Sequence, residues 1–393
     1  MTAAGHPPTV EPGPGWSQDL ANGAPGPALE HIEYACSGTG TWASAHEQVA
    51  MMTRRPVTAL PDDGLFRGAP AVAFVLNAAH TTSYTRALAA LDPHVDRITR
   101  TRLERAHARI DAERLSEIRE WDLISGLTGL GAYQLARHGD SALLRDILAY
   151  LVRLTTPVTV HGQALPGWWC ANGPADLPSR NWPGGHANLG LAHGISGPLA
   201  LLSTAMRHGI GVPGQAGTIK WICTWLDQWR QGSGARAWWP GMLSLAEWQS
   251  GTVCRRGPQR PSWCYGTPGQ ARAQQLAGLA LGNADRRQLA EDALAGCVSD
   301  PAQLFALSDA TLCHGWAGLL LTTWRTAADA RDDRLTRQLP RLRALMDRYL
   351  DGGGQLDRPG LLEGTTGLRL AQHTTSATVP SAARWDACLL LTG

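Results

Sequence analysis

The feature that most constrains the fold is a repeated Gly-x-x-Gly motif, each copy of which opens an apolar, helix-forming stretch. One such motif would carry little information in a chain with 44 glycines. Five copies in the same context indicate an internal repeat. A weaker sixth copy begins at Gly68. The clear copies are Gly126 to Gly129, Gly194 to Gly197, Gly266 to Gly269, Gly315 to Gly318 and Gly364 to Gly367.

Between these copies lie segments whose apolar residues recur at helical spacing. Each unit is therefore expected to be an inner helix, apolar on nearly all sides, followed by an amphipathic outer helix that shields it. Repeating this pair around a closed ring gives an all-α fold, an α/α toroid, with a minor irregular or β extension near Pro157 to Gly162. The expected outer helices are Ala142 to Arg153, Thr218 to Trp229, Arg286 to Val298 and Arg334 to Tyr349.

Two tryptophan-bearing stretches interrupt the helical pattern, residues 155–187 and 232–262. We interpret them as ordered loops over one mouth of the ring, because tryptophan requires burial or a partner. They can form a peptide-binding wall, or the tryptophans can simply anchor the loops.

The first 30 residues are expected to be a disordered tail, since the start of the chain is rich in proline and glycine. It has neither the basic start nor the apolar run of a signal peptide. Residues 31–393 are then expected to form one toroidal domain.

Charge and cysteine content limit the classes of partner and compartment. The formal net charge of +2 gives no electrostatic basis for binding nucleic acid or an anionic membrane surface. No apolar stretch is long enough to cross a bilayer, so no membrane insertion is expected. Eight scattered cysteines do not resemble the dense framework of a small secreted domain. We expect a cytoplasmic protein with reduced thiols.

Residues of types that can bind metals or take part in catalysis stand just before the repeat glycines. His193 precedes Gly194, Cys264 and Tyr265 precede Gly266, and Cys313 and His314 precede Gly315. Asp122 and Arg260 lie slightly further upstream of their glycines. If the repeats are equivalent, all these residues lie at the N-terminal ends of inner helices and gather at one mouth of the ring.

Cys264, Cys313 and His314 form a candidate Zn²⁺ site, because three protein ligands with N and S donors leave a fourth position open, as catalytic zinc sites do. The alternative for any single cysteine at a helix start is a small buried hydrophobe. That alternative is favoured for the cysteines outside the repeat position, namely Cys36, Cys170, Cys223, Cys254, Cys297 and Cys388.

His193 is a candidate general acid or base, with a side chain that titrates near neutral pH. Asp122 can orient the imidazole ring of His193 or favour its charged, protonated form. Arg260 can stabilise an enolate-like negative charge. The competing interpretation for each residue is an ordinary polar group at a helix end. His186 stands on a glycine-rich loop near the same mouth and is taken as structural.

Taken together, these motifs resemble those of the LanC-type lanthipeptide cyclases, and the glycine repeats extend the resemblance from about Leu65 to the C-terminus. The matching segments are Trp121 to Gly129, Pro183 to Gly194, Arg260 to Gly266 and Leu312 to Gly315.

The resemblance implies an α/α toroid with one Zn²⁺ held by Cys264, Cys313 and His314, and no organic cofactor. It also implies a seventh repeat, which the glycine motifs do not locate, and in some members a small extra domain, for which residues 155–187 are the candidate. The catalytic residues that it implies are His193, Asp122, Arg260 and Tyr265.

The implied activity is the addition of peptide cysteine thiols to dehydroalanine and dehydrobutyrine, which forms lanthionine and methyllanthionine. The implied partners are the dehydrated precursor peptide, a lanthipeptide dehydratase and an exporter. Two alternatives stay open. One is a zinc thiol-alkylating toroid of the prenyltransferase type, which needs a carboxylate ligand and a basic diphosphate site. The other is a LanC-like binding protein for thiols or peptides that closes no rings.

Overall fold

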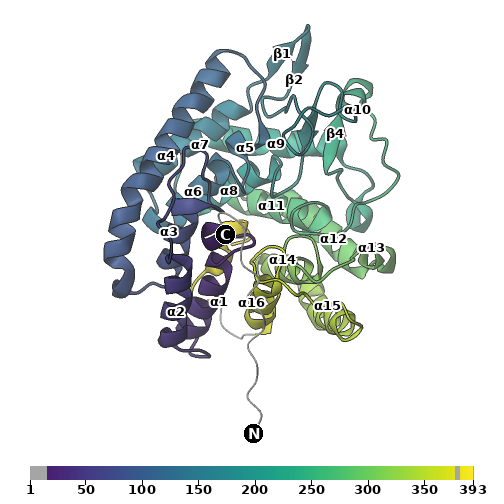
Figure 1. Cartoon of the computed structure of the whole chain (residues 1–393). Helices are drawn as coiled ribbons and strands as arrows, with labels where there is room; N and C mark the ends of the chain where they lie inside the picture. Colours follow the sequence, from purple (N-terminus) through teal and green to yellow (C-terminus); the bar gives the residue numbers. More distant parts are fainter. Residues whose placement is uncertain (1–15, 377–380, 393) are drawn as a thin grey trace.

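The computed structural model describes residues 16–376 and 381–392 and is mostly helical. It confirms the predicted toroid, a ring of inner helices surrounded by outer ones (Figure 1). Neighbouring inner helices are in contact along the chain, and the first also contacts the last, which closes the ring. The inner helices of the described part are α1 (Pro25–Cys36), α3 (Gly68–Ala78), α6 (Leu127–His138), α8 (Ser196–Arg207), α11 (Thr267–Ala280), α14 (Trp316–Asp329) and α16 (Thr365–Ser376).

The outer helices are amphipathic, as their spacing predicts. Helix α15, for example, buries only Leu335, Leu342 and Met346 over 18 residues and exposes its arginine-rich face. Each of the predicted outer helices is present with its ends moved by a few residues. The outer layer contains α2 (Trp42–Met52), α4 (Thr85–Asp111), α7 (Ala142–Leu154), α9 (Gln215–Trp229), α12 (Ala284–Ser299) and α15 (Arg334–Asp351).

The missing seventh repeat lies at the start of the chain, in the segment expected to be a tail. Gly23 to Gly26 is a further Gly-x-x-Gly motif, and it leads directly into α1. Leu20 is fully buried, and its N–H donates to the carbonyl of Phe66 at 2.9 Å. The expected disorder is therefore wrong for residues 16–30, where Pro25 starts a helix, a position that suits proline. Residues 1–15 lie outside the described residues.

The second glycine of each motif is a point of close packing between repeats. A Cβ atom on Gly269 would collide with the carbonyl oxygen of Trp263 and come within 3.1 Å of Leu191 Cβ in the preceding repeat. The same pair of neighbours recurs at the other clear copies, with the carbonyl six residues upstream and a side chain of the preceding repeat. The corresponding glycines are Gly129, Gly197, Gly318 and Gly367.

Backbone hydrogen bonds join the repeats around the mouth at the N-terminal ends of the inner helices. Six bonds between equivalent segments of adjacent repeats, each just before a repeat glycine, connect all seven segments. These bonds hold equivalent positions of adjacent repeats side by side. The position of a residue within its repeat therefore determines which residues are its neighbours at the mouth. The bonds run from Leu20 N to Phe66 O, Leu362 N to Ala21 O, Cys313 N to Leu362 O, Cys264 N to Cys313 O, Leu191 N to Cys264 O and Leu123 N to Ala192 O.

The two tryptophan-bearing stretches are ordered loops, with two small antiparallel sheets. β1 (Val158–Val160) and β2 (Gln163–Leu165) form a hairpin close to the predicted β segment. β3 (His186–Asn188) pairs with β4 (Met242–Ser244), which ties the two stretches together. The first stretch is therefore a loop with a hairpin rather than an extra domain.

The buried tryptophans of these stretches anchor the loops. Trp168, Trp169 and Trp239 are fully buried. Trp168 lies edge-on to Trp221 and Trp225 of helix α9, at centroid distances of 5.2 and 5.0 Å. For these three residues the anchoring interpretation holds, and a peptide-binding wall made of them does not.

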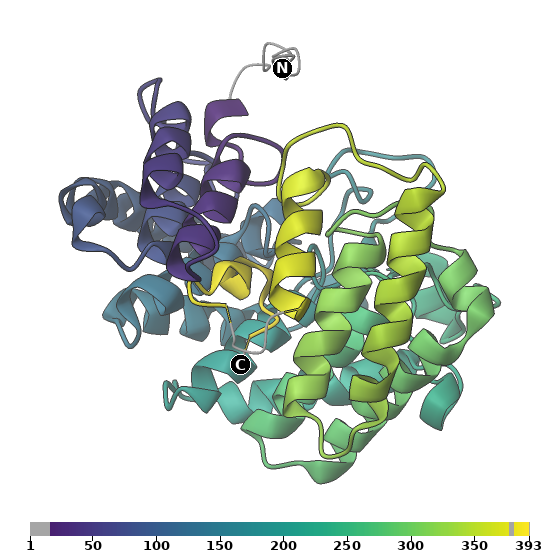
Figure 2. The same cartoon turned by 90° about the horizontal axis from the view of Figure 1, so that it is seen from below.

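The C-terminal segment fills the centre of the ring (Figures 1 and 2). It includes the short helix η4 (Trp385–Leu389) and the residues after it. The indole N–H of Trp263 donates to the carbonyl of Leu389 at 3.0 Å. Arg272 donates to the carbonyl of Leu391 through Nε and Nη2, at 3.0 and 2.7 Å. The toroid is therefore a packed body rather than an open channel.

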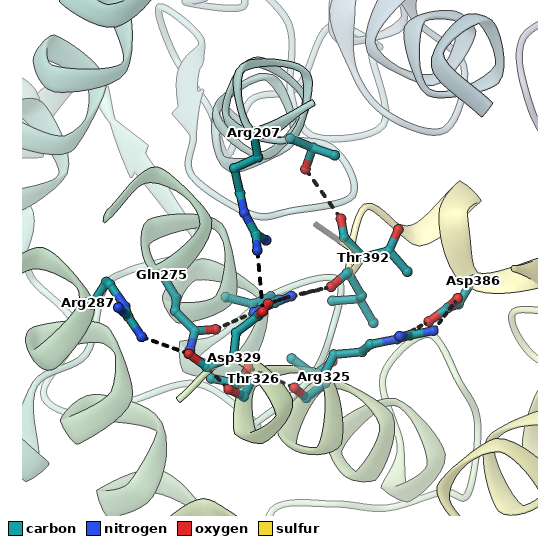
Figure 3. Close-up of polar contacts among 12 residues, drawn as sticks. Arg207, Gln275, Arg287, Arg325, Thr326, Asp329, Asp386 and Thr392 are labelled. Carbon is teal, nitrogen blue, oxygen red and sulfur yellow. Dashed lines mark hydrogen bonds and ion pairs between the residues drawn. The ribbon is translucent and has the colours of Figure 1, made fainter. Parts of the chain in front are cut away.

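Helix α11 is not apolar on nearly all sides, as we expected of inner helices, and part of the reason is that its Arg272 hydrogen-bonds the C-terminal segment. Gln270, Arg272, Gln274 and Gln275 are all buried on it. Arg272 pairs with Asp329 at 2.7 Å, within a polar network around the plug that Figure 3 shows. Burial lowers the pKa of Arg272 to about 10, which still leaves the guanidinium charged at neutral pH.

No helix of residues 16–376 and 381–392 is both long and apolar enough to cross a membrane.

Candidate metal centre and active site

The two residues that directly precede the first glycine of each motif line the mouth of the ring. Cys264 and Cys313 each stand two residues before that glycine, and the backbone bond between their repeats places them as neighbours. The position directly before the glycine is occupied by His193, Tyr265 and His314. The seven-fold repeat therefore converts residues far apart in sequence into one cluster, as the glycine pattern predicts.

Cys264, Cys313 and His314 come together as a possible metal site. Their sulfur and ring-nitrogen atoms all lie within 4.8 Å of one another. Two thiolates and one imidazole match the donor set of tetrahedral zinc sites, with Zn–S near 2.3 Å and Zn–N near 2.0–2.1 Å. The three residues fit a single Zn²⁺ that retains one position for another ligand.

The two sulfur atoms are coupled. Hydrogen bonding to Cys313 lowers the pKa of the Cys264 thiol well below its ordinary value, and contacts to His314 and Ser262 act in the same direction. The same contact with Cys264 raises the pKa of the Cys313 thiol. The hydrogen bond to Cys264 also raises the pKa of His314. The cluster thus stabilises a thiolate, the form of cysteine that binds metals.

A second histidine, His193, lies beside this cluster and is held by a buried carboxylate. Its Nδ1 lies 2.6 Å from Asp122 Oδ2, while the Asp122 side chain is only 1% exposed and that of His193 is 38% exposed. Burial disfavours the imidazolium, but the hydrogen bond and charge of Asp122 outweigh it and raise the pKa of His193. Asp122 therefore favours the protonated imidazole and leaves Nε2 as the ring nitrogen that it does not hold.

Tyr265 faces His193 across the mouth, with the two rings stacked at a centroid distance of 6.4 Å. Its hydroxyl accepts a hydrogen bond from Asn188 Nδ2 at 2.8 Å. Burial raises the pKa of Tyr265, so the phenol stays protonated and can donate a hydrogen bond. Asn188 is a fully buried partner to which sequence reasoning gave no role.

Arg260 is linked to His314 through an aspartate that sequence reasoning also missed. Arg260 Nη1 lies 3.7 Å from Asp309 Oδ2, and the same oxygen lies 3.3 Å from His314 Nε2. Asp309 stands six residues before Gly315, as Arg260 stands six residues before Gly266, so the repeat position of Arg260 was the signal that could have identified it. The guanidinium is partly exposed and adds positive charge beside the cysteines.

Residues expected to be structural fall into two groups. His186 lies in strand β3 with its Nδ1 2.8 Å from the carbonyl of Asn172, and burial lowers its pKa. The expectation of a buried hydrophobe is wrong for Cys254, which is exposed in an open loop after α10 (Leu245–Ser250), and Cys36 is only half-buried. It holds for the fully buried cysteines Cys170, Cys223, Cys297 and Cys388.

Comparison with known proteins gives consistent results for sequence and fold. The family described as lanthionine synthetase C-like protein matches residues 14–390. The nisin biosynthesis protein NisC of Lactococcus lactis subsp. lactis is 23% identical over 251 residues, which are 63% of this chain and 59% of that protein. This chain therefore aligns with less than two thirds of that relative.

The solved structure of nisin cyclase superposes on this chain with a TM-score of 0.80. The superposition covers 96% of this chain and 93% of that one, at 20% sequence identity. At this level of identity, the likeness establishes a shared toroidal fold.

Proposed function

Because the chain belongs to the family of lanthionine synthetase C-like proteins, we propose that it is a zinc-dependent lanthipeptide cyclase. It would add cysteine thiols of a dehydrated precursor peptide to dehydroalanine and dehydrobutyrine. The observation that carries this proposal is the convergence of the Cys264, Cys313 and His314 cluster with the Asp122–His193 pair at one mouth. Such an arrangement offers a thiol-activating centre beside a proton donor.

Cys264, Cys313 and His314 would hold the metal. Zn²⁺ bound there would supply the positive charge that makes a substrate thiol ionise at neutral pH. The chain's own contribution is a preformed donor set, in which one sulfur already favours its thiolate form.

The reaction needs no redox step. The substrate thiolate forms a C–S bond with the β-carbon of the dehydro residue, and the electrons of the C=C bond move to the α-carbon and its carbonyl, as an enolate. One proton added at the α-carbon completes the thioether, so the proton lost by the thiol is balanced by the proton gained at carbon.

His193 is proposed to be the general acid. Asp122 lies 2.6 Å from its Nδ1 and favours the imidazolium, so Nε2 is the nitrogen that would donate the proton. A positioned general acid contributes typically about 10²–10⁴-fold to a rate.

Arg260 and Tyr265 are proposed to stabilise the enolate. Both present donors next to the cysteines, a guanidinium from Arg260 and a protonated phenol from Tyr265. Removing one such preorganised donor typically costs about 10²–10³-fold in rate.

The proposal includes a precursor peptide, a lanthipeptide dehydratase and an exporter as partners, and a cytoplasmic location. All eight cysteines lie in the described part of the chain and none forms a disulfide, which supports a reducing compartment.

Two rival functions predict different results. A prenyltransferase-type enzyme needs a carboxylate in its ligand set, whereas the metal-type cluster found in the described residues contains two cysteines and one histidine. A thiol- or peptide-binding protein needs the mouth but not a proton donor, so the Asp122–His193 pair favours the cyclase.

The test is ring closure in a peptide with one cysteine and one dehydroalanine. Ring closure itself changes no mass, so the peptide is treated with a thiol-blocking reagent before mass spectrometry, and only the open form gains the blocking group. The wild-type protein should leave the peptide unblocked. An equal blocked fraction with wild-type protein, with Cys313→Ala and without protein would reject the cyclase.

A further inference from the structure

The two histidines of the mouth occupy the same repeat position but are held by opposite ring nitrogens. His193 and His314 each directly precede a first glycine, and each is paired with an aspartate. Asp122 engages Nδ1 of His193 at 2.6 Å, whereas Asp309 lies 3.3 Å from Nε2 of His314. The repeat position alone therefore does not determine which ring nitrogen faces the centre of the mouth. The aspartate partner of each histidine determines it.

The Asp309 carboxylate is fixed by its own loop. Its Oδ1 accepts hydrogen bonds from the backbone N–H of Thr311 at 2.9 Å and from Thr311 Oγ1 at 2.6 Å. Its backbone carbonyl accepts the N–H of Trp316 at 3.1 Å, at the start of helix α14. With Oδ1 engaged in this way, only Oδ2 is directed at His314 and Arg260.

The glycine of this repeat leaves space for that carboxylate. A Cβ atom on Gly315 would collide with Asp309 Oδ1 and with the Asp309 carbonyl oxygen. The turn that carries His314 therefore closes tightly over Asp309, and the His314 N–H lies 3.3 Å from Thr311 Oγ1. Carboxylate, threonine and histidine form one small rigid unit.

We infer that Asp309 is a positioning residue that holds His314 with Nδ1 toward the two cysteines and keeps Arg260 beside them. This inference rests on the proposed zinc site. A histidine ligand commonly donates its other N–H to a carboxylate, which fixes the ring orientation and increases the basicity of the ligating nitrogen. Because Oδ2 is shared, Asp309 also links the orientation of the metal ligand to the placement of Arg260, 3.7 Å away.

The test separates orientation of His314 from folding of the loop. Asp309→Asn keeps an oxygen for Thr311 but turns an NH₂ group toward His314, so it removes the acceptor while preserving the shape. Thr311→Val removes the hydroxyl contact but leaves the Asp309 Oδ2 atom and the backbone N–H bond in place. Asp122→Asn is the matched control, because it changes the aspartate partner of the histidine that is not a proposed ligand.

Zinc affinity is measured for each full-length variant by competition with a chromogenic chelator, and Co²⁺-loaded protein gives an independent ligand-field spectrum. Loss of an outer carboxylate typically weakens metal binding about 10–100-fold. Asp309→Asn should show such a loss and an altered cobalt spectrum, while Thr311→Val and Asp122→Asn stay within a few-fold of wild type. Thermal unfolding of the metal-free proteins checks that all variants fold.

The outcomes distinguish this inference from the proposed function. Wild-type protein that binds no zinc would reject the metal site and the role of Asp309 together. Wild-type affinity in Asp309→Asn would reject the role of Asp309 alone. An equal loss in Thr311→Val would show that the loop, and not the Oδ2 acceptor, governs binding, and would also overturn the inference.

Discussion

Replacing Asp122 with asparagine should slow ring closure most strongly at high pH. Asp122 Oδ1 accepts the N–H of Ser125 at 2.8 Å, so the asparagine oxygen should keep that bond and its NH₂ group should face His193 Nδ1. The imidazolium carries N–H groups on both nitrogens and would then meet a donor instead of a carboxylate. The variant should therefore disfavour the acidic form of His193.

The size of the effect follows from the bond that is lost. A hydrogen bond to a charged group contributes about 1.5–3 kcal/mol. At about 1.36 kcal/mol for each tenfold change, this corresponds to roughly a 10- to 150-fold loss of the imidazolium population, and hence of rate. Burial disfavours the imidazolium of His193 and Asp122 raises its pKa, so the wild type retains the acid to higher pH than the variant. Below the titration range of both proteins, the two rates should converge.

Single-turnover ring closure is measured from about pH 5 to 9, a range that brackets histidine titration, with zinc content determined on the same samples. Asp332→Asn serves as a control, because Asp332 is exposed and pairs with Arg334 at the surface. A rate ratio between wild type and Asp122→Asn that does not change with pH would refute the proposal that Asp122 acts by favouring the protonated His193.

Two further predictions concern the fold. Arg272→Met should destabilise the protein by about 1–3 kcal/mol in urea unfolding, because it leaves the buried Leu391 carbonyl without this donor, while the half-buried Asp329 retains Arg207; a loss below 1 kcal/mol would contradict the role given to the plug. Gly269→Ala should cost about 1–3 kcal/mol by overpacking. The same change at Gly217 in α9, where nothing lies within 4 Å, should stabilise by about 0.4–1 kcal/mol; thermal unfolding that gave both variants the same sign would argue against the inter-repeat contact.

The repeat could be predicted because it depends on one residue type at a fixed place. Only glycine allows the carbonyl of Trp263 and the Cβ of Leu191 to approach Gly269 as closely as they do. Once the repeats are equivalent, residues that directly precede their glycines must share the mouth. Neighbouring positions for Cys264 and Cys313 follow from that equivalence.

At the start of the chain, the composition and the glycine pattern predict different structures. The segment around Gly23 and Pro25 has the composition of a disordered tail, yet it starts the helix that closes the ring. The same proline at the first turn of a helix was the signal that could have located the seventh repeat.

Contacts between side chains of different segments could not be predicted from spacing. Buried Arg272 of α11 donates to the carbonyl of Leu391, more than 100 residues away, and Gln270 donates to the carbonyl of Pro240 in a loop. Asp309 shares the repeat position of Arg260, six residues before a first glycine, but its role depends on which ring nitrogen of His314 it engages. Such directions are set by local hydrogen bonds, which a periodic pattern does not encode.

The central claim is that metal binding and proton transfer are separate functions of adjacent groups at one mouth. It is tested most directly by measuring zinc content and ring closure on the same preparations of wild type, Cys313→Ala and His193→Asn. The wild type should hold about one zinc per chain, as expected for one three-ligand catalytic site. Cys313→Ala should lose both metal and activity, whereas His193→Asn should keep its zinc and close rings about 10²–10⁴-fold more slowly. Full zinc in Cys313→Ala, loss of zinc in His193→Asn, or normal ring closure in His193→Asn would each contradict it.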